Sequence, residues 1–321
     1  MQTNPNDIDP EIRDHLSKLE KKYNAMGQDL SSYLDGLLHA DYLTYWDYVN
    51  LDTLLTLQQP KTPFKDEMIF ITYHQITELY FKLILWEIDQ IRIEIAHTDK
   101  WFLEKIRRIN RYFLQLSNSF DIMVEGMSRK EFLSFRMSLL PSSGFQSAQY
   151  RFIEIGSTDM RNLLSPKHRE SLSSVDDFDK IYENIYWKEG ASELATGEKT
   201  LTLKQFEEKY SEQLLSRMRQ YKDRNLNRVY LNNHMESELG DEIREELRTL
   251  DVSANINWPL SHYKSAAKHL QKDPDVIAAT GGTNWQKYLP PRFQKVSFFP
   301  ELWNEEEKQE WGKSWVKEVL Q

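Results

Sequence analysis

The stretch FITYHQITELYFKLILWEIDQI, residues 70–91, most constrains the fold of this chain, because it is long, largely apolar and interrupted only by one or two polar residues at a time. Its apolar positions recur every three to four residues, which is the period of an α-helix. Leu, Lys, Glu and Gln are abundant, whereas glycine and proline number only 11 each. We therefore predict an all-α protein built around a buried central helix from about Asp66 to His97.

The rest of the chain has the same helical character. We find no internal repeat, no low-complexity linker and no convincing β-hairpin, so we predict a single domain over 1–321. An N-terminal arm is expected over 1–40, and an excursion rich in Ser, Asp and Glu, with short helices, over 156–200. The capping box Ser128 to Glu131 and the pair Trp258-Pro259 each predict the start of a helix. Further helices are expected over 9–23, 43–58, 101–123, 203–221, 240–250 and 300–321.

Composition excludes several classes of function. The chain has no cysteine, so it can form no disulfide, thiolate-bound zinc, iron–sulfur cluster or covalent c-type haem. Any metal must be bound through His, Asp or Glu. A net charge of −9 argues against nucleic acid and anionic membranes as partners. The N-terminus resembles no signal peptide, and charges break the apolar run from Met68 to Ile95, so we expect a cytoplasmic protein.

Familiar site patterns are absent. The sequence contains no dinucleotide or phosphate-binding glycine loop, no G-x-S-x-G and no H-E-x-x-H. The pair Glu94-x-x-His97 resembles half of a di-iron carboxylate site. Such a site needs two of these pairs, and the chain has one.

His74 is the first candidate for a functional residue. It shares one face of the central helix with Phe70, Thr77, Phe81 and Leu85, which are apolar apart from the threonine. One interpretation is a core histidine bonded to a carbonyl group. The other is an imidazole at a pocket, able to accept or donate one hydrogen bond near neutral pH.

Three further positions are candidates for binding a substrate or a cofactor. Arg136 lies on an otherwise apolar face with Phe132, Phe135 and Leu139, where a guanidinium is either a snorkelling or ion-paired side chain or a fork for a substrate carboxylate. His262 precedes the small residues Ser265 and Ala266, which leave the clearance that an axial ligand to a flat macrocycle needs, although a surface histidine is also compatible. The loop Thr280-Gly-Gly-Thr283 is a candidate anion-binding or lid loop. Together these features suit a non-covalent haem site that binds an aromatic carboxylate.

Several stretches, in order, resemble tryptophan 2,3-dioxygenases. The longest are KDEMIFITYHQITELYFKLILWEID from Lys65 and FLSFRMSLLPSSGFQSAQYRFIE from Phe132. The shorter ones are YWDYVNLDTLL, NWPLSHYKSAAKHL, ATGGTNWQKYL and FFPELW. These matches run from about residue 42 to residue 303.

The resemblance implies a helical-bundle domain with a non-covalent b-type haem pocket, one haem per subunit. It implies that His262 is the axial ligand of the haem iron, that Ser143 and Gly144 lie against the haem, and that His74 is the catalytic residue beside the indole N–H. Arg136 would bind the carboxylate of L-tryptophan and Thr280 its ammonium group. The indole pocket would be lined by Phe70, Phe132 and Leu139.

The resemblance also implies a reaction and an assembly. Both atoms of O₂ would be inserted across the indole C2–C3 bond of L-tryptophan to give N-formylkynurenine, the step of tryptophan catabolism that begins the kynurenine pathway. The chain would form a homotetramer in which Tyr45 and Tyr48 enter the neighbouring subunit's site.

The chain departs from the family pattern in the loop and before it. Ala279 replaces a glycine, Asn284-Trp285 replaces Ser-Gly, and Lys272 to Asp275 form an insertion of about four residues. Tyr80 replaces a common tryptophan, and the spacing alone makes His269 a competitor of His262 as ligand. These departures leave open a same-fold haem monooxygenase that forms an oxindole from a tryptophan derivative, and a non-catalytic haem or amino-acid sensor.

Overall fold

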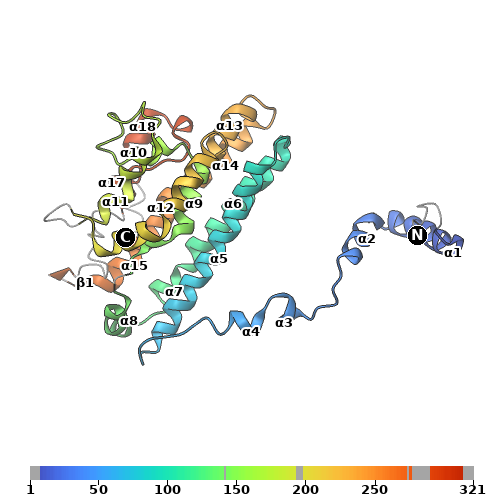
Figure 1. Cartoon of the computed structure of the whole chain (residues 1–321), viewed down its shortest axis with the longest axis horizontal. Helices are drawn as coiled ribbons and strands as arrows, with labels where there is room; N and C mark the ends of the chain where they lie inside the picture. The colour runs from blue at the N-terminus through green and yellow to red at the C-terminus, as the bar shows by residue number, and fades with distance from the viewer. Residues whose placement is uncertain (1–7, 141, 193–197, 273–274, 277–289, 314–321) are drawn as a thin grey trace. The chain divides into compact units, whose positions relative to one another are not determined.

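A computed structural model describes residues 8–140, 142–192, 198–272, 275–276 and 290–313. Contacts divide the chain into two units, Met1–Gln58 and Gln59–Gln321, and each is described by itself. Both units are helical, which confirms the predicted all-α class (Figure 1). The single domain over 1–321 stays a prediction.

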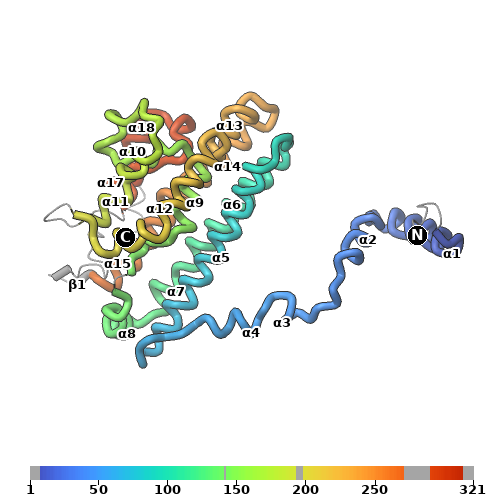
Figure 2. The backbone as a smooth tube through the Cα atoms, in the orientation of Figure 1, coloured from blue at the N-terminus to red at the C-terminus, as the bar shows by residue number. Residues whose placement is uncertain are grey.

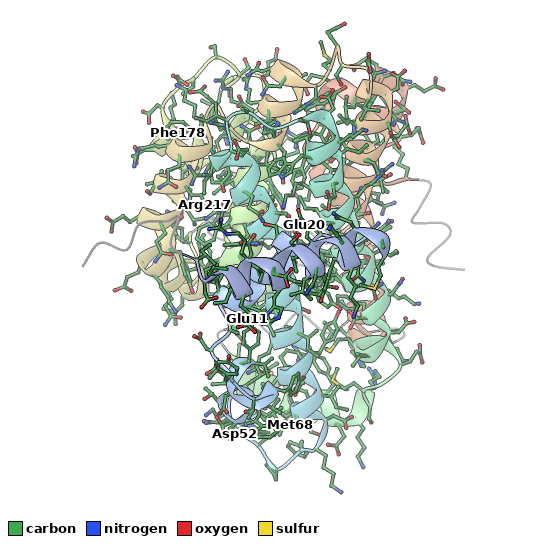
Figure 3. The ribbon with its side chains drawn as sticks, turned by 90° about the vertical axis from the view of Figure 1, so that its right-hand side faces the viewer. Glu11, Glu20, Asp52, Met68, Phe178 and Arg217 are labelled. Carbon is green, nitrogen blue, oxygen red and sulfur yellow. The ribbon has the colours of Figure 1, made fainter. Side chains whose placement is uncertain are left out.

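The first unit consists of short helices with no buried residue in any of them. They are α1 (Pro10–Ala25), α2 (Leu30–Leu38), α3 (Tyr45–Tyr48) and α4 (Leu51–Leu54). Helix α1 agrees with the prediction and carries charged side chains such as Glu11 and Glu20 (Figure 3). The continuous helix predicted over 43–58 is wrong, because Asn50 adopts a left-handed conformation with φ of 52° and separates α3 from α4.

The second unit contains the long helices. Its α-helices are α5 (Asp66–Ile93), α6 (Asp99–Ser119), α7 (Asp121–Val124), α8 (Arg129–Phe135), α9 (Ala148–Ser157), α10 (Phe178–Glu183), α11 (Tyr186–Gly190), α12 (Leu201–Tyr221), α13 (Leu226–Asn233), α14 (Gly240–Val252), α15 (Trp258–Leu270), α17 (Pro291–Gln294) and α18 (Glu305–Gln309). Short turns of 3₁₀-helix are η1 (Arg136–Leu139), η2 (Gly144–Gln146), η3 (Met160–Leu163) and η5 (Pro300–Leu302), and η4 (Ser253–Asn257) is a π-helix.

One pair of strands accompanies the helices of this unit. Strands β1 (Gln271–Lys272) and β2 (Asp275–Val276) pair antiparallel, at the position of the expected insertion. The sequence analysis missed this pair because two-residue strands are too short to show a period. Among the described residues, no helix is long and apolar enough to cross a membrane.

Helix α5 is the centre of the packing in the second unit. It lies beside α6 and α9, α6 also packs on α14, and α12 covers α9 (Figures 1 and 2). Ile84, Ile88 and Ile91 of α5 are fully buried. Gly156 of α9 permits the close approach of the two helices, because a Cβ there would lie 2.7 Å from Cγ2 of Ile88. The predicted central helix is therefore confirmed, although only one of its faces is buried.

Several helix ends differ from the predictions. Helix α5 ends at Ile93 rather than near His97, because the Glu94 carboxylate accepts the N–H groups of Ile95 and Ala96 and turns the chain. The helix expected over 300–321 is reduced, in its described part, to η5 and α18. Helix α15 begins at Trp258 as predicted, but the π-helix η4 joins it to α14 without a break.

A buried carboxylate attaches the C-terminal segment to α14. Asp251 is fully buried near the end of α14 and accepts five hydrogen bonds. The donors are Asn255 Nδ2 at 2.7 Å, Ser297 Oγ at 2.7 Å, Phe298 N at 2.8 Å, Phe299 N at 3.2 Å and Trp303 Nε1 at 2.8 Å. One side chain therefore accepts hydrogen bonds from four groups of residues 297–303.

Replacing Asp251 with alanine should destabilise the chain strongly. Five buried donors would lose their acceptor, and we expect the free energy of unfolding to fall by about 3 kcal/mol or more. Urea unfolding followed by circular dichroism measures this loss. Asp241→Ala on the same helix is the control, since that side chain is 98% exposed and its loss should change stability by about 0.5 kcal/mol or less. Equal unfolding midpoints for the two variants would contradict the prediction.

Candidate functional site

The starts of α5 and α8 cap each other. The backbone N–H of Lys65 donates to Glu131 Oε2 at 3.0 Å, and the N–H of Ser128 donates to Asp66 Oδ2 at 2.7 Å. The predicted capping box within α8 is therefore wrong, because Glu131 caps the other helix. These two hydrogen bonds hold the starts of α5 and α8 together, and both helices contain candidate site residues.

Aromatic side chains from α5 and α8 form one wall of the site. Phe70 of α5 lies with its ring centroid 6.4 Å from that of Phe132 and 5.7 Å from that of Phe135, both on α8. Phe135 is fully buried in the core, whereas Phe70 and Phe132 are half-buried. The structure thus brings together the two phenylalanines that the sequence analysis assigned to an indole pocket.

His74 lies one turn after Phe70, and the two rings are in tilted contact. The ring centroids are 4.1 Å apart, and Nδ1 lies 2.7 Å from the Phe70 carbonyl oxygen. A carbonyl oxygen can only accept, so Nδ1 carries the proton and the neutral ring has its lone pair on Nε2. The surrounding protein displaces water and lowers the pKa of His74, although the bond to Phe70 and the charge of Glu78 oppose this effect. The His74 side chain is exposed and only its Nδ1 has a hydrogen-bond partner among the described residues, so Nε2 is an available acceptor near neutral pH.

His262 has the same local arrangement on α15. Its Nδ1–H donates to the carbonyl of Trp258 at 3.1 Å, and its half-buried ring lies 4.5 Å from the Trp258 ring and 4.6 Å from the Phe120 ring. Desolvation lowers the pKa of His262 to about 4, with the bond to Trp258 opposing the shift. Nε2 has no hydrogen-bond partner among the described residues and keeps its lone pair.

The two imidazoles are neighbours. A positive charge on His74 is near enough to lower the pKa of His262. Tyr73 and Phe120 connect them through ring contacts, with centroid distances of 5.9 Å from His74 to Tyr73 and 5.5 Å from Tyr73 to Phe120. Two neutral histidines therefore belong to one aromatic region, each with an Nε2 lone pair.

His269 differs from both. It is buried, and its Nε2–H donates to the Met123 carbonyl at 2.8 Å, so that nitrogen is committed to the backbone. Its ring lies 5.0 Å from Phe132. The geometry therefore gives no support to His269 as the haem ligand in place of His262, a role that the sequence spacing alone had left open.

Arg136 is buried at the junction of α8 and η1. The expected α-helix ends at Phe135 and continues as 3₁₀-helix, which carries Arg136 and the half-buried Leu139. Burial lowers the pKa of Arg136, and the side chain stays charged near neutral pH. A charged guanidinium in a desolvated position binds carboxylates strongly.

The remaining predicted residues have different environments. The N–H of Ser143 donates to Gln146 Oε1 at 2.8 Å, and next to it the space beside Gly144 is open, with no atom within 4 Å of a built Cβ. Tyr45 and Tyr48 are 71% and 76% exposed in the first unit. Thr280, Ala279 and Asn284-Trp285 lie outside the described residues.

The sequence analysis missed the role of α9. Gln149 Nε2 donates to both the carbonyl and the carboxylate of Glu78 at 2.8 Å, one turn after His74. The next residue, Tyr150, donates its hydroxyl to the Ala254 carbonyl at 2.8 Å, two turns before His262. Adjacent polar residues in the stretch QSAQY were the available signal.

The di-iron hypothesis receives no support. His97 Nδ1 lies 3.0 Å from His234 Nε2, and His234 Nδ1 lies 2.5 Å from Asp99 Oδ1, so these rings bond to each other. Within the described part of the chain, no group of three or more His, Cys, Asp or Glu is arranged to hold a metal ion.

Comparison with known proteins identifies relatives. A family model described as tryptophan 2,3-dioxygenase matches residues 38–273. A tryptophan 2,3-dioxygenase of Ruegeria sp. (strain TM1040) is 42% identical over 117 residues, covering 36% of this chain and 41% of that protein. The tryptophan 2,3-dioxygenase of Polaromonas naphthalenivorans is 37% identical over 136 residues, covering 41% of this chain and 48% of that protein. The one of Xanthomonas oryzae is 35% identical over 160 residues, covering 46% of this chain and 54% of that protein. The matches span about half the length of these relatives.

The lowered pKa of His262 predicts a pH dependence of stability in the chain without bound cofactor. The folded ring titrates near pH 4 and an unfolded one near 6.5, so the unfolded state binds more protons between these values. The free energy of unfolding should therefore decrease as the pH falls from about 6.5 to about 4, by up to about 3 kcal/mol. Urea unfolding across this range should show a shallower dependence for His262→Gln. The exposed control His39→Gln should follow the unmodified chain, and parallel curves for all three proteins would contradict the prediction.

Proposed function

Because this chain belongs to the tryptophan 2,3-dioxygenase family, we propose that it is a haem-dependent dioxygenase acting on L-tryptophan. The reaction inserts both atoms of O₂ across the indole C2–C3 bond and yields N-formylkynurenine, as in the kynurenine pathway of tryptophan catabolism. One observation carries the proposal: two neighbouring neutral imidazoles, each with an Nε2 lone pair, lie beside an aromatic wall. Neither a structural scaffold nor a hydrolase requires that pairing.

The described residues suit a non-covalent haem. His262 would hold the iron through Nε2, since its Nδ1–H is committed to Trp258 and the ring stays neutral near pH 7. Ser143 and Gly144 would lie against the macrocycle, and the open space beside Gly144 leaves room for a flat group. When bound, the haem supplies the oxygen chemistry, and the protein supplies binding and orientation.

His74 would orient the substrate. Its Nε2 lone pair can accept a hydrogen bond from the indole N–H, because Nδ1–H is already bound to the Phe70 carbonyl. The lowered pKa keeps this acceptor unprotonated at neutral pH. A protonated ring would present a donor instead and would repel the indole N–H.

The remaining side chains would select a zwitterionic aromatic amino acid. Arg136 would pair with the carboxylate, and Phe70, Phe132 and Leu139 would contact the indole. Burial of Arg136 strengthens such a pair, because little water competes for the guanidinium. Thr280, which we propose for the ammonium group, lies outside the described residues.

We also propose a homotetramer in which the first unit of one copy covers another copy. That unit has no buried residue in its helices yet exposes large apolar side chains, including Tyr45 and Tyr48, so it lacks a core of its own. Helix α5 exposes a second apolar surface that no described element of its own unit covers. The α5 stripe consists of Ile76, Leu79, Leu83, Trp86 and Ile93. Its first four members are three or four residues apart and Ile93 follows seven residues after Trp86, as in a helix-pairing seam.

The reaction is tested with the full chain reconstituted with haem, reduced, and given L-tryptophan in air. We expect a Soret band and a product whose mass exceeds that of tryptophan by two oxygen atoms. Arg136→Leu should keep the band and raise KM by about 10- to 100-fold, as expected for the loss of a hydrogen bond to a charged group. The control Arg219→Leu, on the surface of α12, should leave KM unchanged.

Each other outcome would contradict a defined part of the proposal. A product with one added oxygen atom would identify a monooxygenase. A Soret band without turnover would indicate a sensor, and a chain that takes up no haem would refute the assignment of His262.

The assembly is tested by placing charge on the α5 stripe. Leu83→Glu combined with Trp86→Glu should reduce the sedimentation coefficient, because buried carboxylates without partners would oppose pairing. The control Lys100→Glu changes an exposed charge on α6 and should leave the sedimentation coefficient unchanged. An assembly of unaltered size in the double variant would exclude this stripe as an interface.

A further inference from the structure

The helix that carries His262 contains a wide turn two turns before it. At η4 the N–H of Trp258 donates to the carbonyl of Ser253, five residues back rather than four. A π-turn holds one more residue than an α-turn and therefore changes the direction of every side chain that follows. The orientation of His262 depends on this turn being kept.

The wide turn takes from the Ala254 carbonyl its usual partner in the helix. The Ala254 carbonyl would bond to the N–H of Trp258 in an α-turn, but that N–H is used by Ser253. In a π-turn the Ala254 carbonyl would accept from the N–H of residue 259, but that residue is a proline and has no N–H. A buried carbonyl needs another donor, and the Tyr150 hydroxyl supplies it at 2.8 Å.

Tyr150 is itself held firmly. It is buried on α9, and its ring lies 5.4 Å from Phe81 of α5, which in turn lies 5.7 Å from Trp258. Burial raises the pKa of the phenol well above its usual value, so the hydroxyl remains a donor at any physiological pH. The next residue back, Gln149, binds Glu78 beside His74. Helix α9 thus links the two helices that carry the histidines.

We propose that Tyr150 is a positioning residue for His262. Its hydroxyl holds the π-turn through the Ala254 carbonyl, and the turn places Trp258, whose carbonyl accepts the Nδ1–H of His262. The inference rests on the proposed function only in that His262 is taken as the haem ligand. Nothing in the family comparison assigns this role to the tyrosine hydroxyl.

The experiment removes the hydroxyl from the reconstituted full chain with Tyr150→Phe, which keeps the ring against Phe81. We expect the iron–histidine stretching band of the ferrous protein to shift and haem transfer to apomyoglobin to accelerate about two- to tenfold. Hydrogen exchange should also be faster at the amides of η4. Tyr182→Phe is the matched control, since it removes another buried tyrosine hydroxyl, bonded to Ser211 Oγ at 3.0 Å, from a different helix. Tyr182→Phe should leave the iron–histidine band, the rate of haem transfer and the hydrogen exchange at η4 unchanged.

The two variants together test the proposed cause. Tyr150→Phe indistinguishable from Tyr182→Phe in all three readouts would overturn the inference. An unmodified chain that takes up no haem would instead overturn the proposed function, and hydrogen exchange at η4 would still show whether Tyr150 holds the turn.

Discussion

The buried carboxylate of Asp251 is the interaction on which the arrangement of the second unit most depends. The C-terminal elements η5 and α18 are too short to be stable alone, and backbone, indole and hydroxyl donors from residues 297–303 all converge on this side chain. Its fifth donor, Asn255, belongs to the π-turn. The same carboxylate therefore attaches a distant segment and supports the base of the helix that carries His262.

The same kind of local hydrogen bond sets the tautomer of both candidate site histidines. In each, the carbonyl four residues earlier in the same helix takes the Nδ1–H, so the helix itself selects the tautomer with a lone pair on Nε2. What separates His74 and His262 from other helical histidines is their surroundings, which favour the neutral ring. The comparison with His269 makes this clear, since there the backbone takes the other nitrogen.

Periodicity was sufficient to predict the helical class, the central helix α5 and the face that His74 shares with Phe70. These features depend on residues close together in sequence, where spacing reports the shared face directly. The grouping of Phe70 with Phe132 of α8 came instead from resemblance to a family. The mutual capping of α5 and α8 joins Lys65 to Glu131, and a local pattern instead suggested a capping box inside α8. The π-turn was also missed, because it depends on Tyr150, far away in sequence, as well as on Pro259. The roles of individual site residues came from resemblance to a family, and they stay predictions.

The exchange of caps between α5 and α8 has a consequence for the dynamics of the chain. Helix ends usually fray independently, because each first turn has only its own cap to lose. Here each helix start supplies the carboxylate that accepts an N–H of the other start. When one start unfolds, its carboxylate moves away and the other start also loses a hydrogen bond. The two ends thus behave as one cooperative unit of local unfolding. Phe70 and Phe132 share the combined stability of both helices, which makes this wall of the site more rigid than either helix end would be alone.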